Sequence, residues 1–89
     1  SAADLSAEER IARLLCSLST RFSSRGYSAK EFNLSMSRRD IASNLRLATE
    51  TISRVLARFQ SAGLIKVNRK KVAILQEEKL MELARRDTC

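Results

Sequence analysis

The chain has 89 residues, of which 44% are hydrophobic and 30% charged, and these values fit one small domain with a modest core. Its formal net charge is +7 at pH 7 and its isoelectric point is about 10.3, which favours a polyanionic partner. The sequence has no histidine, and Cys16 is far from Cys89, which argues against a metal site and a disulfide framework. It also has no long apolar run and no signal peptide, which argues against a membrane protein.

We therefore expect a cytoplasmic domain that binds no metal, with Cys16 as a helical side chain of no chemical role.

The first predicted element is a long helix over 7–25. Ser6 and Glu9 have the spacing of a capping box, and Gly26 is the expected stop. The apolar positions follow helical spacing and are Ile11, Leu14, Leu15, Leu18 and Phe22.

A short strand is predicted over 32–36, where apolar and polar residues alternate. The stretch 37–63 then predicts two helices joined by a tight turn. Ser37 and Asp40 repeat the capping box and open a helix over 38–45, with Ile41 and Leu45 inward and the small Ala42 where the second helix approaches. The second helix is expected over 49–61, before Gly63.

This second helix has two chemically different faces. Its apolar face is expected in the core and consists of Ile52, Val55, Leu56 and Phe59. Its polar face carries Glu50, Ser53 and Arg54, a carboxylate, a hydroxyl and a guanidinium that suit base edges in the DNA major groove. The alternative interpretations are a surface ion pair between Glu50 and Arg54, four residues apart, and a plain solvent-facing Ser53.

Residues 64–75 predict a hairpin, or wing, whose polar tip is the basic run 68–71. A last helix is expected over 76–86, with Leu80 and Leu83 inward. Residues 31–75 hold nine basic and three acidic side chains, so the positive charge is concentrated on the two-helix unit and the wing. The whole pattern predicts a mainly α-helical domain over 1–89 with a small β-hairpin or sheet, a winged helix-turn-helix.

From Tyr27 to Ile74 the chain resembles the C-terminal DNA-binding domain of the cyclic AMP receptor/FNR family of bacterial transcription regulators. The motifs that carry this resemblance are Arg21-Phe22, Lys30-Glu-Phe-Asn-Leu-Ser-Met36, Arg39-Asp-Ile41, Glu50-Thr-Ile-Ser-Arg54 and Arg58-Phe-Gln60. The cyclic AMP receptor pattern at the start of the second helix is R-E-T-V-G-R. This chain has Thr49-Glu-Thr-Ile-Ser-Arg54 there, which is similar to the FNR subgroup.

The resemblance implies recognition of a TTGAT-type half-site in double-stranded DNA. By position, Arg54 would donate to guanine, Glu50 would accept from cytosine and Ser53 would contact thymine; the first two pairings are also the geometrically favoured ones. The implied phosphate contacts are Arg38, Arg39, Thr51, Arg58, Asn68, Arg69, Lys70 and Lys71. For Arg58 and the wing lysines, the alternative is a solvated side chain without a DNA contact.

Two residues depart from the family pattern. The turn glycine is replaced by Arg46, which would be strained by about 1–2 kcal/mol if the turn needs a positive φ. Whether Arg46 also contacts phosphate is left open by the sequence. The usual Ser or Thr cap of the second helix is Ala48, at a loss of about 1 kcal/mol, and Thr49 is an alternative cap one residue later.

The family's sensory domain and long dimerisation helix have no counterpart in these residues, so we expect a DNA-binding part of a longer homodimeric protein. We expect the DNA-binding domain alone to bind no cofactor and to be largely monomeric. An iron–sulfur cluster, haem or nucleotide would belong to the sensory domain. RNA polymerase is a further candidate partner. Two alternative functions are a protein–protein module, which needs an exposed apolar patch, and sequence-indifferent nucleic-acid binding through charge. No catalytic set or phosphate-binding loop assembles, so we expect no enzyme.

Overall fold

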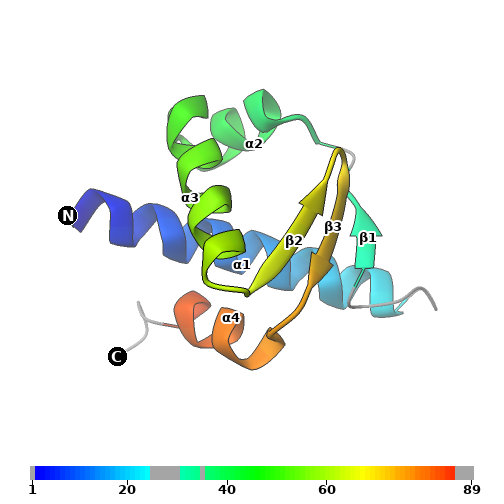
Figure 1. Ribbon diagram of the computed structural model, residues 1–89. Helices are drawn as coiled ribbons and strands as arrows, with labels where there is room; N and C mark the ends of the chain where they lie inside the picture. Colours follow the sequence, from blue (N-terminus) through cyan, green and yellow to red (C-terminus); the bar gives the residue numbers. More distant parts are fainter. Residues whose placement is uncertain (1, 25–30, 35, 86–89) are drawn as a thin grey trace.

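The computed structural model describes residues 2–24, 31–34 and 36–85. Within them, four helices pack with a three-stranded antiparallel sheet (Figure 1). The elements are α1 (Ala2–Ser24), β1 (Glu31–Asn33), α2 (Arg38–Leu45), α3 (Thr49–Ser61), β2 (Ile65–Asn68), β3 (Lys71–Ile74) and α4 (Glu77–Ala84). The predicted winged helix-turn-helix is therefore confirmed, with α2 and α3 at the predicted bounds.

The first helix starts earlier than predicted. It begins at Ala2, so Ser6 lies inside it and the expected cap at Ser6 is wrong. Alanine and leucine, which precede Ser6, are strong helix formers, so the helix extends beyond the serine. Ala7, Ile11 and Leu15 are buried at successive turns, while Leu14 and Leu18 pack at the edge of the core. The predicted roles of the Phe22 side chain and of Gly26 lie outside the described residues.

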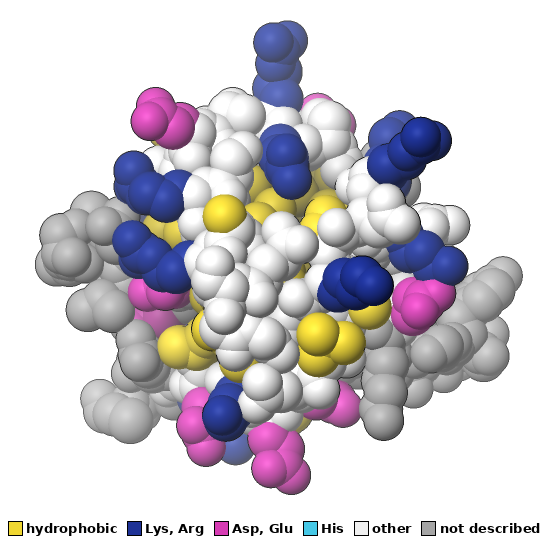
Figure 2. Space-filling model, viewed as in Figure 1, with side chains coloured by type: hydrophobic (Ala, Val, Ile, Leu, Met, Phe, Trp, Pro, Cys, Tyr) yellow, Lys and Arg dark blue, Asp and Glu magenta, His cyan; other side chains and the backbone are white. Residues whose placement is uncertain are grey.

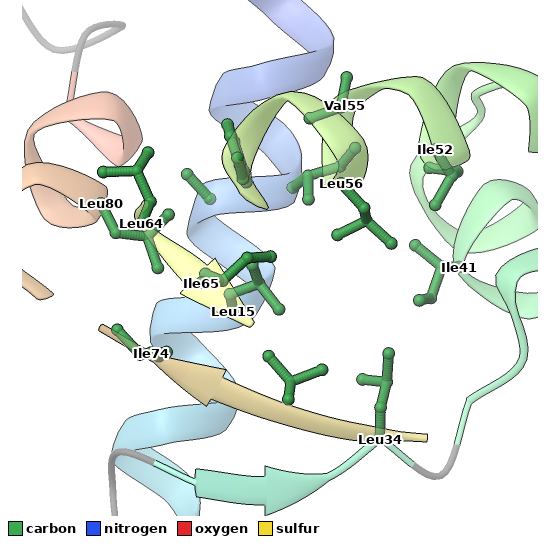
Figure 3. Packing of buried hydrophobic residues seen from close by; sticks show 14 of the residues in the cluster. Leu15, Leu34, Ile41, Ile52, Val55, Leu56, Leu64, Ile65, Ile74 and Leu80 are labelled. Carbon is green, nitrogen blue, oxygen red and sulfur yellow. The ribbon is translucent and has the colours of Figure 1, made fainter. Parts of the chain in front are cut away.

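The core lies between α1, α3 and the sheet. Leu56 points toward the strands, Ile52 lies beside Ile41 of α2, and Leu15 lies beside Ile65 of β2 (Figure 3). All four predicted apolar residues of α3 are at most 3% exposed. Ile41 and Ala42 of α2 are buried against α3, and Leu45 is partly buried, as predicted. One continuous apolar cluster thus fixes α3 with its opposite face outward.

The sheet has the order β1-β3-β2. Phe32 and Val67 pair with Val72 on its inner face, whereas Asn33 and Asn68 both pair with Lys71 on its outer face. The first strand covers Glu31–Asn33 rather than the predicted 32–36. It ends there because its partner β3 begins at Lys71, opposite Asn33, and beyond this pair the hairpin turn offers no strand residue.

The last helix closes the core against α1. Leu80 is fully buried, and Arg13 Nε donates a hydrogen bond to the Ala84 carbonyl at 2.9 Å. Gly63 lies between α3 and β2 and has a φ of +75°. Its carbonyl accepts a hydrogen bond from Gln76 Nε2 at 2.9 Å. No helix among the described residues is long and apolar enough to cross a bilayer.

Candidate nucleic-acid interface

The start of α2 is fixed by a local hydrogen-bond pair. The Asp40 N–H donates to Ser37 Oγ at 3.1 Å, and the Ser37 N–H donates to Asp40 Oδ2 at 3.3 Å. This is the predicted capping box. It places Arg38 and Arg39 in the first helical turn, where both side chains are exposed. Two cations are thus held at one end of α2.

The turn between α2 and α3 has a left-handed residue. Arg46 has φ 57° and ψ 47°, and its backbone N–H points to the Ala42 and Ser43 carbonyls. The Leu47 N–H also donates to the Ala42 carbonyl, at 2.8 Å. The geometry is the one for which glycine is favoured, so the arginine is strained by about 1–2 kcal/mol. The turn therefore needs a positive φ at Arg46, which is the condition under which the sequence predicts strain.

The start of α3 has no side-chain cap. Ala48 is the N-cap residue with φ −72° and ψ 145°, and its methyl group cannot accept a hydrogen bond. Thr49 is the first helical residue, so the alternative in which Thr49 caps the helix is wrong. The Ile52 N–H donates to the Ala48 carbonyl at 3.1 Å, which keeps the helix start in the expected register. Glu50 therefore lies in the first turn.

The outer face of α3 presents the predicted base-reading residues. Glu50 and Arg54 are exposed, while Ser53 and Thr51 are half-buried. Because Glu50 and Arg54 are four residues apart, they lie on one side of the helix, about 6 Å from each other along its axis. Ile52, Val55, Leu56 and Phe59 are buried on the other side. The carboxylate and the guanidinium thus occupy the same exposed face.

Arg58, one turn beyond Arg54, makes a contact that the sequence did not indicate. Its Nη1 lies 3.8 Å from Glu8 Oε1 on α1, with the Arg58 side chain 48% exposed and Glu8 only 13% exposed. A phosphate contact by Arg58 would have to share or displace this ion pair. No local signal predicts it, because the partners are far apart in the sequence.

The wing residues divide between two surfaces. A groove of about 460 Å³ separates the wing from α2 and α3, and Arg38, Arg69 and Lys70 line it together with Met36, Gln60 and Val67. The groove shape is held by the Val67 N–H, which donates to Gln60 Oε1 at 3.2 Å. Arg69 at the tip of the wing has a φ of 58°, which is a strained conformation. It was not predicted from the sequence.

The second surface of the wing is the outer face of the sheet. Lys66, Asn68 and Lys71 lie there with Glu31, and Lys71 Nζ is 2.6 Å from Glu31 Oε1. The structure therefore brings Arg69 and Lys70 next to Arg38, but it does not bring Asn68 and Lys71 to the same groove.

The charge of the described surface is polarised. Figure 2 shows most Lys and Arg side chains over the upper part and the two sides of this face, whereas acidic side chains gather along the lower edge, which holds α4, and are scattered among the basic ones elsewhere. The acidic residues of α4 are Glu77, Glu78 and Glu82. A polyanion would therefore approach the side that carries α2, α3 and the wing.

Comparison with known proteins decides the family. Residues 9–83 match the model of the Crp-like helix-turn-helix domain. The chain belongs to the Crp-like helix-turn-helix family. It is 54% identical over 78 residues to the fumarate and nitrate reduction regulatory protein of Vibrio cholerae, covering 88% of this chain and 31% of that protein. It is 53% identical over 78 residues to the transcriptional activator protein anr of Pseudomonas aeruginosa, covering 88% of this chain and 32% of that protein.

Solved structures agree with this assignment. FixK2 from Bradyrhizobium japonicum matches with a TM-score of 0.72 and 31% identity over 86% of this chain and 37% of FixK2. The Thermus thermophilus catabolite activator protein shares the fold, with a TM-score of 0.71 and 22% identity over 92% of this chain and 35% of that protein. The chain spans about a third of the length of the curated relatives it matches. This Crp-like domain is thus an FNR-like transcription-regulator DNA-binding domain.

The Cys16 thiol lies partly buried on α1. Burial raises the pKa of the Cys16 thiol, with Glu77 acting in the same direction and Arg85 opposing it. The thiol is therefore neutral at physiological pH and a poor nucleophile. Within the described ranges, no group of three or more His, Cys, Asp or Glu side chains could hold a metal ion.

Proposed function

We propose that this domain binds double-stranded DNA sequence-specifically, with α3 in the major groove of a TTGAT-type half-site. The observation that carries the proposal is the joint exposure of Glu50 and Arg54 on the outer face of a helix whose other face is fully buried. A helix anchored in this way presents its polar side chains in a fixed orientation. That rigidity is what base discrimination needs.

Each reading residue has a base partner of matching chemistry. Arg54 donates two hydrogen bonds to O6 and N7 of guanine, and Glu50 accepts from N4 of cytosine, each contact adding about 1–3 kcal/mol of discrimination. Ser53 contacts an adjacent thymine. These three contacts read the half-site.

Phosphate contacts fix the position of the domain on the duplex. The groove between α2 and the wing supports a contact with one stretch of backbone, since Arg38, Arg69 and Lys70 line it from two elements. Arg39 at the start of α2 and Thr51 on α3 add to the same set. Arg58, Asn68 and Lys71 contribute less, because Arg58 and Lys71 are already paired with carboxylates and Asn68 lies with Lys71 on the outer face of the sheet.

The test compares Arg54→Ala with wild type on a duplex that carries the half-site and on a scrambled duplex. We expect about 5- to 150-fold weaker binding to the half-site, from loss of about 1–3 kcal/mol, and a much smaller change on the scrambled duplex. Lys79→Ala, which removes a charge from α4, is the control and should change neither. Equal losses on both duplexes would favour binding through charge alone.

The longer protein to which such a domain belongs is proposed to be a homodimeric regulator that acts on the chromosome in the cytoplasm. Palindromic sites are read by dimers whose recognition helices are about 34 Å apart. A single domain makes half of these contacts. It should therefore bind its half-site weakly and with strong salt dependence.

A further inference from the structure

The turn between α2 and α3 carries a pair of arginines outside the proposed contact set. Arg10 of α1 donates from Nη1 to the carbonyl of Leu45, the last residue of α2, at 3.1 Å. The next residue in the chain is Arg46, and both arginine side chains are exposed. Two arginines from different elements therefore lie at this end of α2, Arg10 through its guanidinium and Arg46 through its backbone.

The structural role of a helix end explains only one of them. The carbonyl end of a helix attracts a cation, and the Arg10 hydrogen bond satisfies this preference. It gives no reason for an arginine at φ 57° and ψ 47°, where glycine or asparagine is easily accommodated. A residue held in an unfavourable conformation at an exposed turn points to a function for its side chain.

The position of the pair suggests what that function is. The helix α2 has eight residues and is therefore about 12 Å long, close to the width of about 12 Å of the DNA major groove. Arg38 and Arg39 lie at its start, and Arg10 and Arg46 lie at its end. With α2 lying across the groove, cations at both of its ends would be near phosphates on the two sides of the groove.

We propose that Arg10 and Arg46 form a second phosphate-binding site, for the DNA backbone on the side of the groove opposite to Arg38 and Arg39. The inference rests on the proposed placement of α3 in the major groove. A guanidinium pair suits this ligand, because each can donate charge-assisted hydrogen bonds to phosphate oxygens. The site reads no sequence, and it holds the end of α2 and the start of α3 against the duplex.

The test uses Arg46→Gly, Arg46→Lys and Arg10→Gln with the half-site duplex and the scrambled duplex, titrated at several salt concentrations. Arg46→Gly should weaken binding to both duplexes about 5- to 10-fold and lower the salt slope by about 0.9. Arg46→Lys should retain the slope, since it keeps the charge. Arg10→Gln should act as Arg46→Gly does, and Lys79→Gln, on α4, is the matched control.

Thermal unfolding distinguishes a loss of DNA binding from a loss of folding. Because glycine relieves the strained turn, Arg46→Gly should raise the unfolding midpoint by about 4–16 °C while it weakens DNA binding. Wild-type affinity and slope in Arg46→Gly would overturn the second site. Equal wild-type binding to the two duplexes would instead overturn sequence-specific recognition, and absence of wild-type binding to either duplex at low salt would overturn both.

Discussion

Lys70 and Lys71 are adjacent lysines of the wing with different surroundings. Lys70 lines the groove beside Arg38 and Arg69, whereas Lys71 is paired with Glu31 on the outer face of the sheet. A cation that already has a carboxylate partner gains less from a phosphate. We expect Lys70→Gln to weaken duplex binding about threefold and to lower the salt slope by about 0.9, with less than half of either effect for Lys71→Gln.

Anisotropy titrations of both variants at several salt concentrations would measure this difference. The two substitutions remove the same charge one residue apart, so each controls for the other. Equal losses would mean that the wing acts through net charge rather than through the groove, and the division of its two surfaces would then have no functional meaning.

The same residues show where sequence reasoning ends. The capping box at Ser37 and the exposed face of Glu50 and Arg54 were predictable because their signals lie within four residues along the chain. The ion pairs of Lys71 and Arg58 were not, because Glu31 and Glu8 meet them only through tertiary packing. The left-handed Arg69 was missed for another reason, since only glycine or asparagine would have signalled a positive φ.

At the scale of elements, α2 and α3 differ in how their first turns are satisfied. Ser37 caps α2 through its hydroxyl, and Ala48 leaves α3 without a side-chain cap. The backbone of Ala48 already has the extended conformation that a capping serine adopts. Ala48→Ser should therefore stabilise the domain by about 1 kcal/mol, which corresponds to an unfolding midpoint about 4–8 °C higher.

Urea and thermal unfolding would measure this change, with Ser37→Ala as the reciprocal variant, expected to destabilise by about 1 kcal/mol. The start of α3 should not move, because Ala48 is already its N-cap residue, so half-site affinity should stay within about twofold. An unchanged midpoint in Ala48→Ser would show that the first turn of α3 has other hydrogen-bond acceptors.

At the scale of the whole molecule, the described surface is suited to DNA rather than to a second copy of the chain. Leu75, at 57% exposure, is the one large hydrophobic side chain exposed among the described residues. A stable protein interface buries at least about 1,000 Å² around an apolar centre, which a single leucine does not supply. The protein–protein module considered from the sequence therefore lacks its surface here, and like charges around α2 and the wing oppose self-association.

We therefore expect sedimentation of the 89-residue chain at micromolar concentration to show a monomer. On a duplex with two inverted half-sites, two copies should bind with equal and independent affinities, because nothing on the described surface joins them. Each binding step should follow the same salt slope, about −0.9 for every phosphate contact. A tight dimer in sedimentation, or a second copy that binds tenfold better than the first, would reveal an interface between domains and contradict the proposal that dimer formation belongs to another part of a longer protein.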